Sequence, residues 1–273
     1  MTEIKLIDTS IEDKIKQELE NSFDNKRKRI FSKIFSAALG SIPWVGGFLS
    51  AMADFKSDEG QVKNNHLYEE WLKEHTEKMK LLGETLIDII KKLDDFSDDV
   101  NDRLESEEYL QIIRKSFRTW DNADTFEKRD LIRKLLMNAG TQKLVPDDLI
   151  RLFLDWLNLY HEVHFAVIKV IYQKKGVTRS EIWNELNGIQ VREDSMEADL
   201  FKLIIRDLST GSVIRQFRQK DYYGNFIKKT PTKSTNTKTF KSAFDEQEGY
   251  ELTELGKQFV HYTMNEVVRK IEE

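Results

Sequence analysis

Apolar residues recur at helical spacing through most of the first half of the chain. Ile11, Ile15, Leu19 and Phe23 stand four residues apart, which gives one apolar stripe on a helix. Similar stripes follow over residues 62–93, 109–120, 127–140 and 147–157, and the third of these is expected to open on a D-x-x-E capping box, Asp124 and Glu127. The pattern predicts a mainly α protein that begins with a multi-helix bundle over residues 1–158.

One segment of this bundle is apolar without interruption. Residues 34–53 form a run of 20 residues without a charged side chain, broken by Pro43 and by three glycines. The breaks predict two short helices that join within GSIPWVGG and form a hairpin. Two roles stay open: the buried centre of the bundle, or a membrane hairpin that inserts on activation, as in helical pore-forming proteins. The membrane alternative rests on Ile42, Pro43, Trp44, Val45, Gly46, Gly47 and Phe48.

The pattern changes in residues 159–273. A helix over 164–172 is followed by a short helix that opens on a T-x-x-E capping box, Thr178 and Glu181. A third helix follows Ser195, with Leu200, Phe201, Ile204, Ile205 and Leu208 as its apolar side. The run SVIRQF then favours a strand, and YELTELGKQFVHYTM favours a strand and a final helix.

This order of elements resembles the winged helix-turn-helix superfamily over residues 160–265. The resemblance rests on the capped short helix Thr178–Leu186, the helix that ends at Leu208, and the pattern Tyr250-Glu251-Leu252-Thr253 with Gly256. It implies that Thr253 caps the closing helix, and that the segment 220–248 is an unusually long wing. Winged helices bind DNA, RNA or protein, or hold subunits together, so the resemblance implies binding without naming the ligand.

The predicted wing and the strand before it carry a dense group of positive charges. Residues 212–241 contain eight lysine and arginine residues and one aspartate, whereas the whole chain has a net charge of −5. Cations neutralise phosphates and aromatic rings stack on bases, so nonspecific nucleic-acid binding is one interpretation and a solvated loop is the other. The candidate contact residues are Arg215, Arg218, Lys220, Tyr222, Tyr223, Lys228, Lys229, Lys233, Lys238 and Lys241.

The third helix argues against sequence-specific reading of DNA. Its exposed positions are expected to be Glu197, Asp199, Lys202, Arg206 and Asp207, which include three acids. A helix in a major groove needs donors toward bases and does not bring carboxylates close to phosphates. Any nucleic acid is therefore expected to contact the wing.

Composition narrows the chemistry further. The chain has no cysteine, which excludes disulfides, thiol nucleophiles and cysteine-based metal sites. His161 and His164 share a helix face, but we expect them to be packing residues, and no common catalytic or phosphate-binding motif occurs. We therefore expect no catalytic residue, no cofactor and no metal.

Two functional hypotheses remain. The first is a non-catalytic adaptor that binds protein or nonspecific nucleic acid through the winged-helix domain, with homo-oligomers conceivable. The alternative is a membrane-acting effector of toxin or bacterial defence type. The charged first residues contain no signal-peptide pattern, so we expect a cytoplasmic protein that associates with a membrane only when activated.

Overall fold

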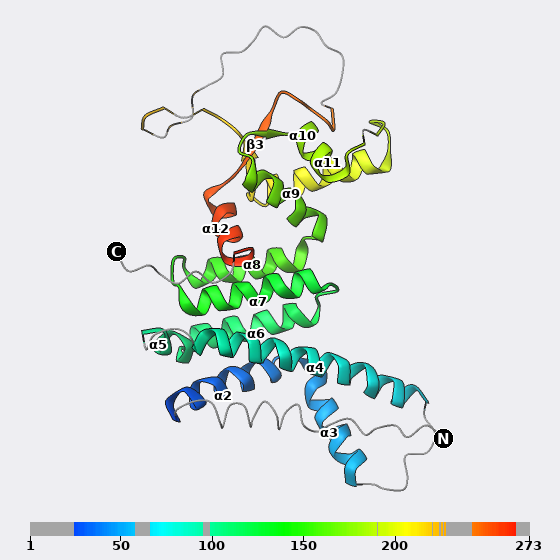
Figure 1. Ribbon diagram of the computed structural model, residues 1–273, viewed down its shortest axis with the longest axis vertical. Helices are drawn as coiled ribbons and strands as arrows, with labels where there is room; N and C mark the ends of the chain where they lie inside the picture. The colour runs from blue at the N-terminus through cyan, green and yellow to red at the C-terminus, as the bar shows by residue number, and fades with distance from the viewer. Residues whose placement is uncertain are drawn as a thin grey trace. The chain divides into compact units, whose positions relative to one another are not determined.

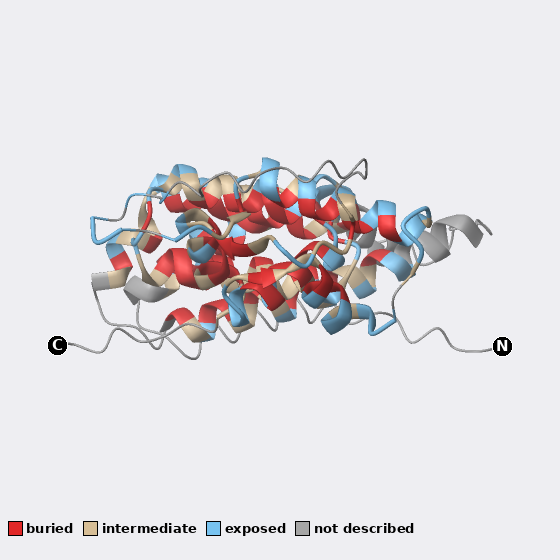
Figure 2. Cartoon of the chain, turned by 90° about the horizontal axis from the view of Figure 1, so that it is seen from above, coloured by how far each residue is buried: buried red, intermediate tan, exposed pale blue. Residues whose placement is uncertain are grey.

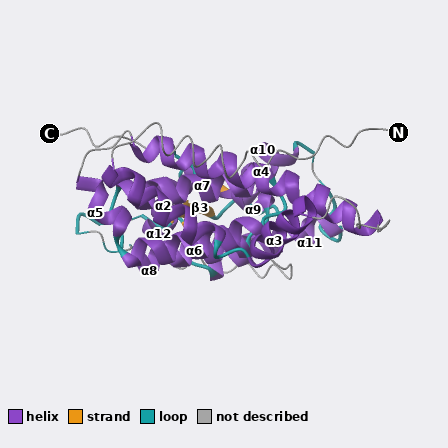
Figure 3. Ribbon diagram, turned by 90° about the horizontal axis from the view of Figure 1, so that it is seen from below, coloured by secondary structure: helices purple, strands orange, loops and turns teal. Residues whose placement is uncertain are grey.

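The computed structural model describes residues 25–57, 66–94, 99–189, 191–219, 221–223, 225, 227 and 242–265. It is mainly helical, with a small antiparallel sheet (Figures 1 and 3). The chain divides into two compact units. Unit 1 comprises residues 1–159 and 262–273, and unit 2 comprises residues 160–261. The predicted helix at Ile11–Phe23 lies outside the described residues.

Unit 1 is built around one central helix. Helix α6 packs against α2, α5, α7 and α8, while α4 packs against α3 and α7. Buried and exposed positions alternate along most of these helices, whereas residues 135–140 of α7 are buried on every side (Figure 2). The helices are α2 (Asn25–Leu39), α3 (Pro43–Ser57), α4 (His66–Asp94), α5 (Asp99–Glu105), α6 (Glu107–Asp121), α7 (Phe126–Thr141) and α8 (Asp147–Leu159).

The apolar segment forms two helices that join within GSIPWVGG, as predicted. Helix α2 ends at Leu39 and α3 already begins at Pro43, so Gly46 and Gly47 are helical. Proline suits the first helical position because its fixed φ fits and no amide hydrogen is needed there. The joint is therefore shorter than GSIPWVGG and comprises only residues 40–42.

Tyr262 also departs from the expected division, which left it in the C-terminal domain. Its ring packs 6.2 Å from that of Phe153, and its hydroxyl accepts a hydrogen bond from the Leu144 amide at 3.1 Å. The Asn138 side chain donates to the Tyr262 carbonyl at 3.1 Å. These contacts explain why Tyr262 belongs to unit 1.

A partly buried ion pair ties three helices of unit 1 together. The Arg103 guanidinium of α5 donates to both carboxylate oxygens of Asp147 on α8, at 2.6 and 2.9 Å. Its Nε donates to the Ala139 carbonyl of α7 at 3.2 Å. The hydrogen bonds from Arg103 hold the pKa of Asp147 below its ordinary value.

The lowered pKa predicts a pH dependence of stability. A carboxyl group whose pKa is lower in the folded state stabilises that state at pH values above its unfolded pKa of about 3.9. This stabilisation is lost as the pH falls through the folded pKa. Asp147→Asn is expected to lower the free energy of unfolding by about 1–2 kcal/mol at pH 7. Urea unfolding measures the difference in the free energy of unfolding between the variant and the wild type. We expect this difference to be smaller at about pH 3 than at pH 7. An equal loss at both pH values would contradict the prediction.

Unit 2 contains four helices and a three-stranded sheet among the described residues. The sheet has the order β1-β3-β2, and both pairs of neighbours are antiparallel. The elements are α9 (Glu162–Gln173), β1 (Val177–Thr178), α10 (Arg179–Asn187), α11 (Met196–Thr210), β2 (Ile214–Gln216), β3 (Gly249–Leu252) and α12 (Glu254–Thr263), whose last two residues belong to unit 1.

The predicted helix caps of unit 2 are confirmed. The Thr178 hydroxyl accepts from the Glu181 amide, and the Glu181 carboxylate accepts from the Thr178 amide at 2.7 Å. This backbone hydrogen bond holds the pKa of Glu181 below its ordinary value. Ser195 caps α11, and the Thr253 hydroxyl accepts from the Gly256 amide at 2.9 Å at the start of α12.

An aromatic cluster fixes α10 and α11 against the chain that precedes β3. The Trp183 ring meets Phe201 at 5.4 Å and Phe244 at 5.0 Å between ring centroids. The Trp183 indole donates to the Ile189 carbonyl at 2.7 Å. Because these rings pack against one side of α11, the opposite side of that helix faces outward.

Candidate binding face

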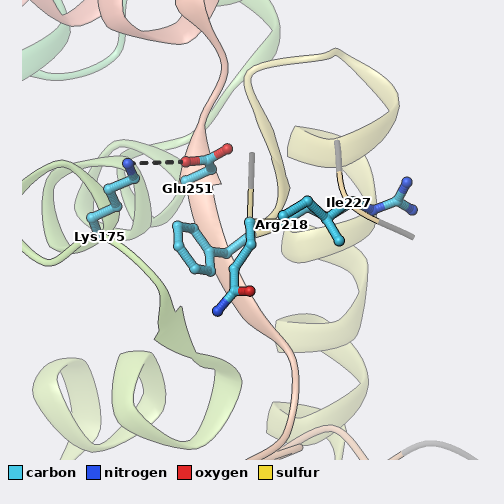
Figure 4. A pocket seen from close by; sticks show the side chains of 6 residues that line it. Lys175, Arg218, Ile227 and Glu251 are labelled. Atoms are coloured by element: carbon cyan, nitrogen blue, oxygen red, sulfur yellow. Dashed lines mark ion pairs between the residues drawn. The ribbon is translucent and has the colours of Figure 1, made fainter. Parts of the chain in front are cut away.

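Arg215, one of the predicted wing contacts, is part of the sheet rather than of an open basic surface. It lies opposite Glu251 in the β2–β3 register, and its Nε donates to Glu251 Oε1 at 2.9 Å. Glu251 is buried, and Lys175 Nζ lies 3.8 Å from its other oxygen (Figure 4). One carboxylate therefore interacts with two cations and offsets one of their two charges.

Arg218 lines a shallow hollow beside this ion pair. The hollow has a volume of about 340 Å³ and is lined by Lys175, Phe217, Arg218, Gln219, Ile227 and Glu251. Lys175 Nζ also sits 5.4 Å from the centre of the Phe217 ring. The hollow combines two cations with a buried carboxylate and two apolar side chains, so its charge is mixed.

The first residues of the predicted wing form a tight turn that exposes two tyrosines. Asp221 Oδ1 accepts from the amides of Tyr223 and Asn225 at 2.9 and 2.8 Å. Tyr222 and Tyr223 are 98% and 86% exposed, with ring centroids 5.6 Å apart. The other predicted contacts, Lys220, Lys228, Lys229, Lys233, Lys238 and Lys241, lie outside the described residues.

The outward side of α11 carries an apolar stripe that the sequence interpretation missed. Met196, Leu200 and Leu203 are 79%, 49% and 39% exposed. They stand four and three residues apart, so they share one face of the helix. Leu200 was expected in the core with Phe201 and Ile204, and this is wrong. The spacing 196, 200, 203 is the sequence signal that could have distinguished this exposed stripe from the buried one.

The charged residues of α11 follow the expected exposed positions. Glu197, Asp199 and Arg206 are exposed, and Lys202 and Asp207 are partly exposed. Lys202 Nζ lies 3.5 Å from Glu193 and 3.6 Å from Asp199. The side chain of Arg206 is 72% exposed, and its Nε lies 3.9 Å from Asp207. The helix therefore presents an acidic first half and a basic position near its end.

A second hollow borders the C-terminal half of α11. Its volume is about 440 Å³, and its lining includes Arg179, Arg206 and Arg215 together with the Tyr250 side chain. The Arg179 Nε donates to the Tyr250 hydroxyl at 2.9 Å. Two of the three arginines thus hold the sheet and α10 in place, and Arg206 extends toward solvent.

His161 and His164 form a helix-capping arrangement. His164 Nδ1 accepts from the His161 amide at 3.2 Å, and the His164 ring stacks on Tyr160 with centroids 5.1 Å apart. His164 Nε2 lies 3.9 Å from Asp207 on α11. Among the residues that the structure describes, no group of three histidine, aspartate or glutamate side chains is arranged to hold a metal ion.

The residues named for the membrane alternative are divided between the core and the surface of unit 1. Ile42, Val45 and Phe48 are buried, whereas Pro43, Gly46 and Gly47 are exposed. Trp44 donates its indole hydrogen to Asp121 of α6 at 2.8 Å. Within the described part of the chain, no helix has both the length and the apolar content needed to cross a membrane.

Comparison with known proteins gives no relative for this chain. It matches no family model, and neither the curated proteins nor the solved structures contain a match.

Proposed function

We propose that the protein is a non-catalytic adaptor whose unit 2 is a winged-helix domain that docks another protein chain. The order α9-β1-α10-α11-β2-β3 and the sheet order β1-β3-β2 support the winged-helix interpretation. In this interpretation α11 takes the place of the helix that winged-helix domains present to a ligand. Function is therefore argued from the chemistry of the outward face of α11.

The observation that carries the proposal is the stripe Met196, Leu200 and Leu203. Leucine and methionine side chains gain free energy when a protein partner removes them from water. The same face would bring Glu197 and Asp199 toward the phosphates of a duplex, which costs free energy. An apolar centre with charged edges is the arrangement that helices use when they bind another protein.

Site-specific photo-crosslinking tests the proposal. A photoreactive amino acid at Leu203 is expected to give discrete protein adducts in the cells that make this protein. The same group at Lys257, an exposed position of α12 in the same unit, serves as the matched control and should not give these adducts. Absence of any adduct specific to position 203 would refute the proposal.

Nonspecific nucleic-acid binding is a second candidate, because Tyr222 and Tyr223 are held outward at the start of the basic wing segment. Exposed rings beside cations can stack on bases of single strands while the cations follow the phosphates. Changing Lys228, Lys229, Lys233 and Lys238 to Glu should then abolish a gel shift at low salt. An unaltered shift would remove this candidate.

A further inference from the structure

We infer that the partner on the α11 stripe is a second copy of this chain, with the two α11 helices antiparallel across a two-fold axis. The inference rests on the proposed function, because it names the occupant of the same face. Two features of α11 carry it: the position of its apolar side chains and the order of its charges.

The apolar side chains suit pairing with themselves. In an antiparallel pair centred between positions 201 and 202, Leu200 of each copy meets Leu203 of the other. Met196 then covers the far end of the partner helix near position 207. Asp207 lies at this position, with its Oδ2 3.9 Å from His164 Nε2. The stripe is thus complementary to its own copy, as a two-fold interface requires.

The charges select the antiparallel direction. Asp199 and Arg206 are seven residues apart, so they lie on the same flank of the stripe, two turns from each other. Side chains on one flank of an antiparallel pair face the same flank of the partner. Asp199 of each copy would therefore meet Arg206 of the other, which forms two equivalent ion pairs. In a parallel pair this flank would face the opposite flank of the partner, so Asp199 and Arg206 would not meet.

One axis serves both sets of contacts. The midpoint of Leu200 and Leu203 and the midpoint of Asp199 and Arg206 differ by one residue, or about 1.5 Å along the helix. Side chains of this length accommodate such a shift. The ion pairs that the two residues make within one chain are long: 3.6 Å between Asp199 and Lys202, and 3.9 Å between Arg206 and Asp207. Both can reorient toward a partner.

The interface is small, and this sets the expected affinity. Three apolar side chains and two ion pairs are far fewer contacts than the roughly 20–30 residues a side of a standard interface. We expect weak self-association, with a Kd on the order of 10–100 µM.

Sedimentation equilibrium of the full chain tests the pairing directly. Between about 5 and 500 µM the wild-type protein should pass from monomer to dimer. Asp199→Lys and Arg206→Glu should each weaken the dimer at least about 10-fold, because like charges then face each other twice. Lys257→Glu, a charge reversal of the same size on α12, should leave the Kd unchanged.

Mixing the two reversal variants gives the decisive result. Asp199→Lys with Arg206→Glu restores opposite charges at both ion pairs, so a mixed dimer should form with a Kd within about threefold of wild type. Loss of folding in either variant alone cannot produce this recovery. Leu203→Asp should abolish the dimer in every combination.

Three outcomes would overturn the inference: a monomer throughout the concentration range, a dimer that is insensitive to the charge reversals, or no recovery on mixing. A photo-crosslink from position 203 to a different protein, together with a monomeric purified chain, would refute self-pairing and leave the proposed docking function standing. Absence of both the crosslink and the dimer would refute both.

Discussion

Gly256→Ala is expected to lower the free energy of unfolding of unit 2 by about 2–3 kcal/mol. A Cβ at this position would lie 2.2 Å from the Val213 carbonyl oxygen and 3.1 Å from its carbon. The carbonyl cannot easily move away, because it accepts from the Thr253 amide at 3.0 Å. Urea unfolding followed by circular dichroism measures the change.

Gly47→Ala provides a control with the opposite sign. Gly47 is also helical, but it is exposed, and a Cβ there would meet no atom within 4 Å. Alanine is a better helix former than glycine, so this change should stabilise unit 1 by about 0.5–1 kcal/mol. Equal effects of the two substitutions would show that the close approach of Gly256 to Val213 is not a constraint.

Local capping chemistry was the most predictable part of the fold. A capping box needs only residues three positions apart, and the one formed by Thr178 and Glu181 is present as expected. The D-x-x-E box expected at Asp124 is wrong, because Thr125 caps α7 and its hydroxyl accepts from the Lys128 amide. Two adjacent residues can both cap a helix, so the local pattern does not determine the first turn.

The extent of the joint in the apolar segment could not be predicted from the sequence, because packing outweighs helix propensity there. Each helical glycine costs about 1 kcal/mol relative to alanine. Burial of Val45 and Phe48 on one side of α3 offsets that cost, although the glycines between them are exposed. Sequence patterns report the propensity but not which face a neighbouring helix will cover.

The candidate site was only partly predictable, for reasons of tertiary structure. The charges of α11 were assigned correctly to its exposed side, because helical periodicity fixes them relative to the buried face. Arg215 was expected at a ligand, but its partner Glu251 is 36 residues away along the chain. Such a pair depends on strand register, which spacing alone does not reveal.

Val45→Asp is expected to destabilise unit 1 strongly. Val45 is only 2% exposed in unit 1. A carboxylate placed there loses its hydration and gains no cation, so the free energy of unfolding should fall by about 3–5 kcal/mol. Thermal unfolding followed by circular dichroism should show this as a lower melting temperature or as an unfolded protein.

Gly46→Asp is the matched control, because the neighbouring position is exposed and close to the start of α3. Aspartate near a helix N-terminus is favourable, so the change in stability should stay within about 0.5 kcal/mol.

The same substitution, combined with Gly47→Asp, also tests the membrane alternative. If the segment inserts into bilayers, the wild type should release dye from vesicles. A normally folded Gly46→Asp, Gly47→Asp protein should then lose this activity, because charges oppose burial in hydrocarbon. Retained leakage would leave residues 42–48 with a structural role in unit 1.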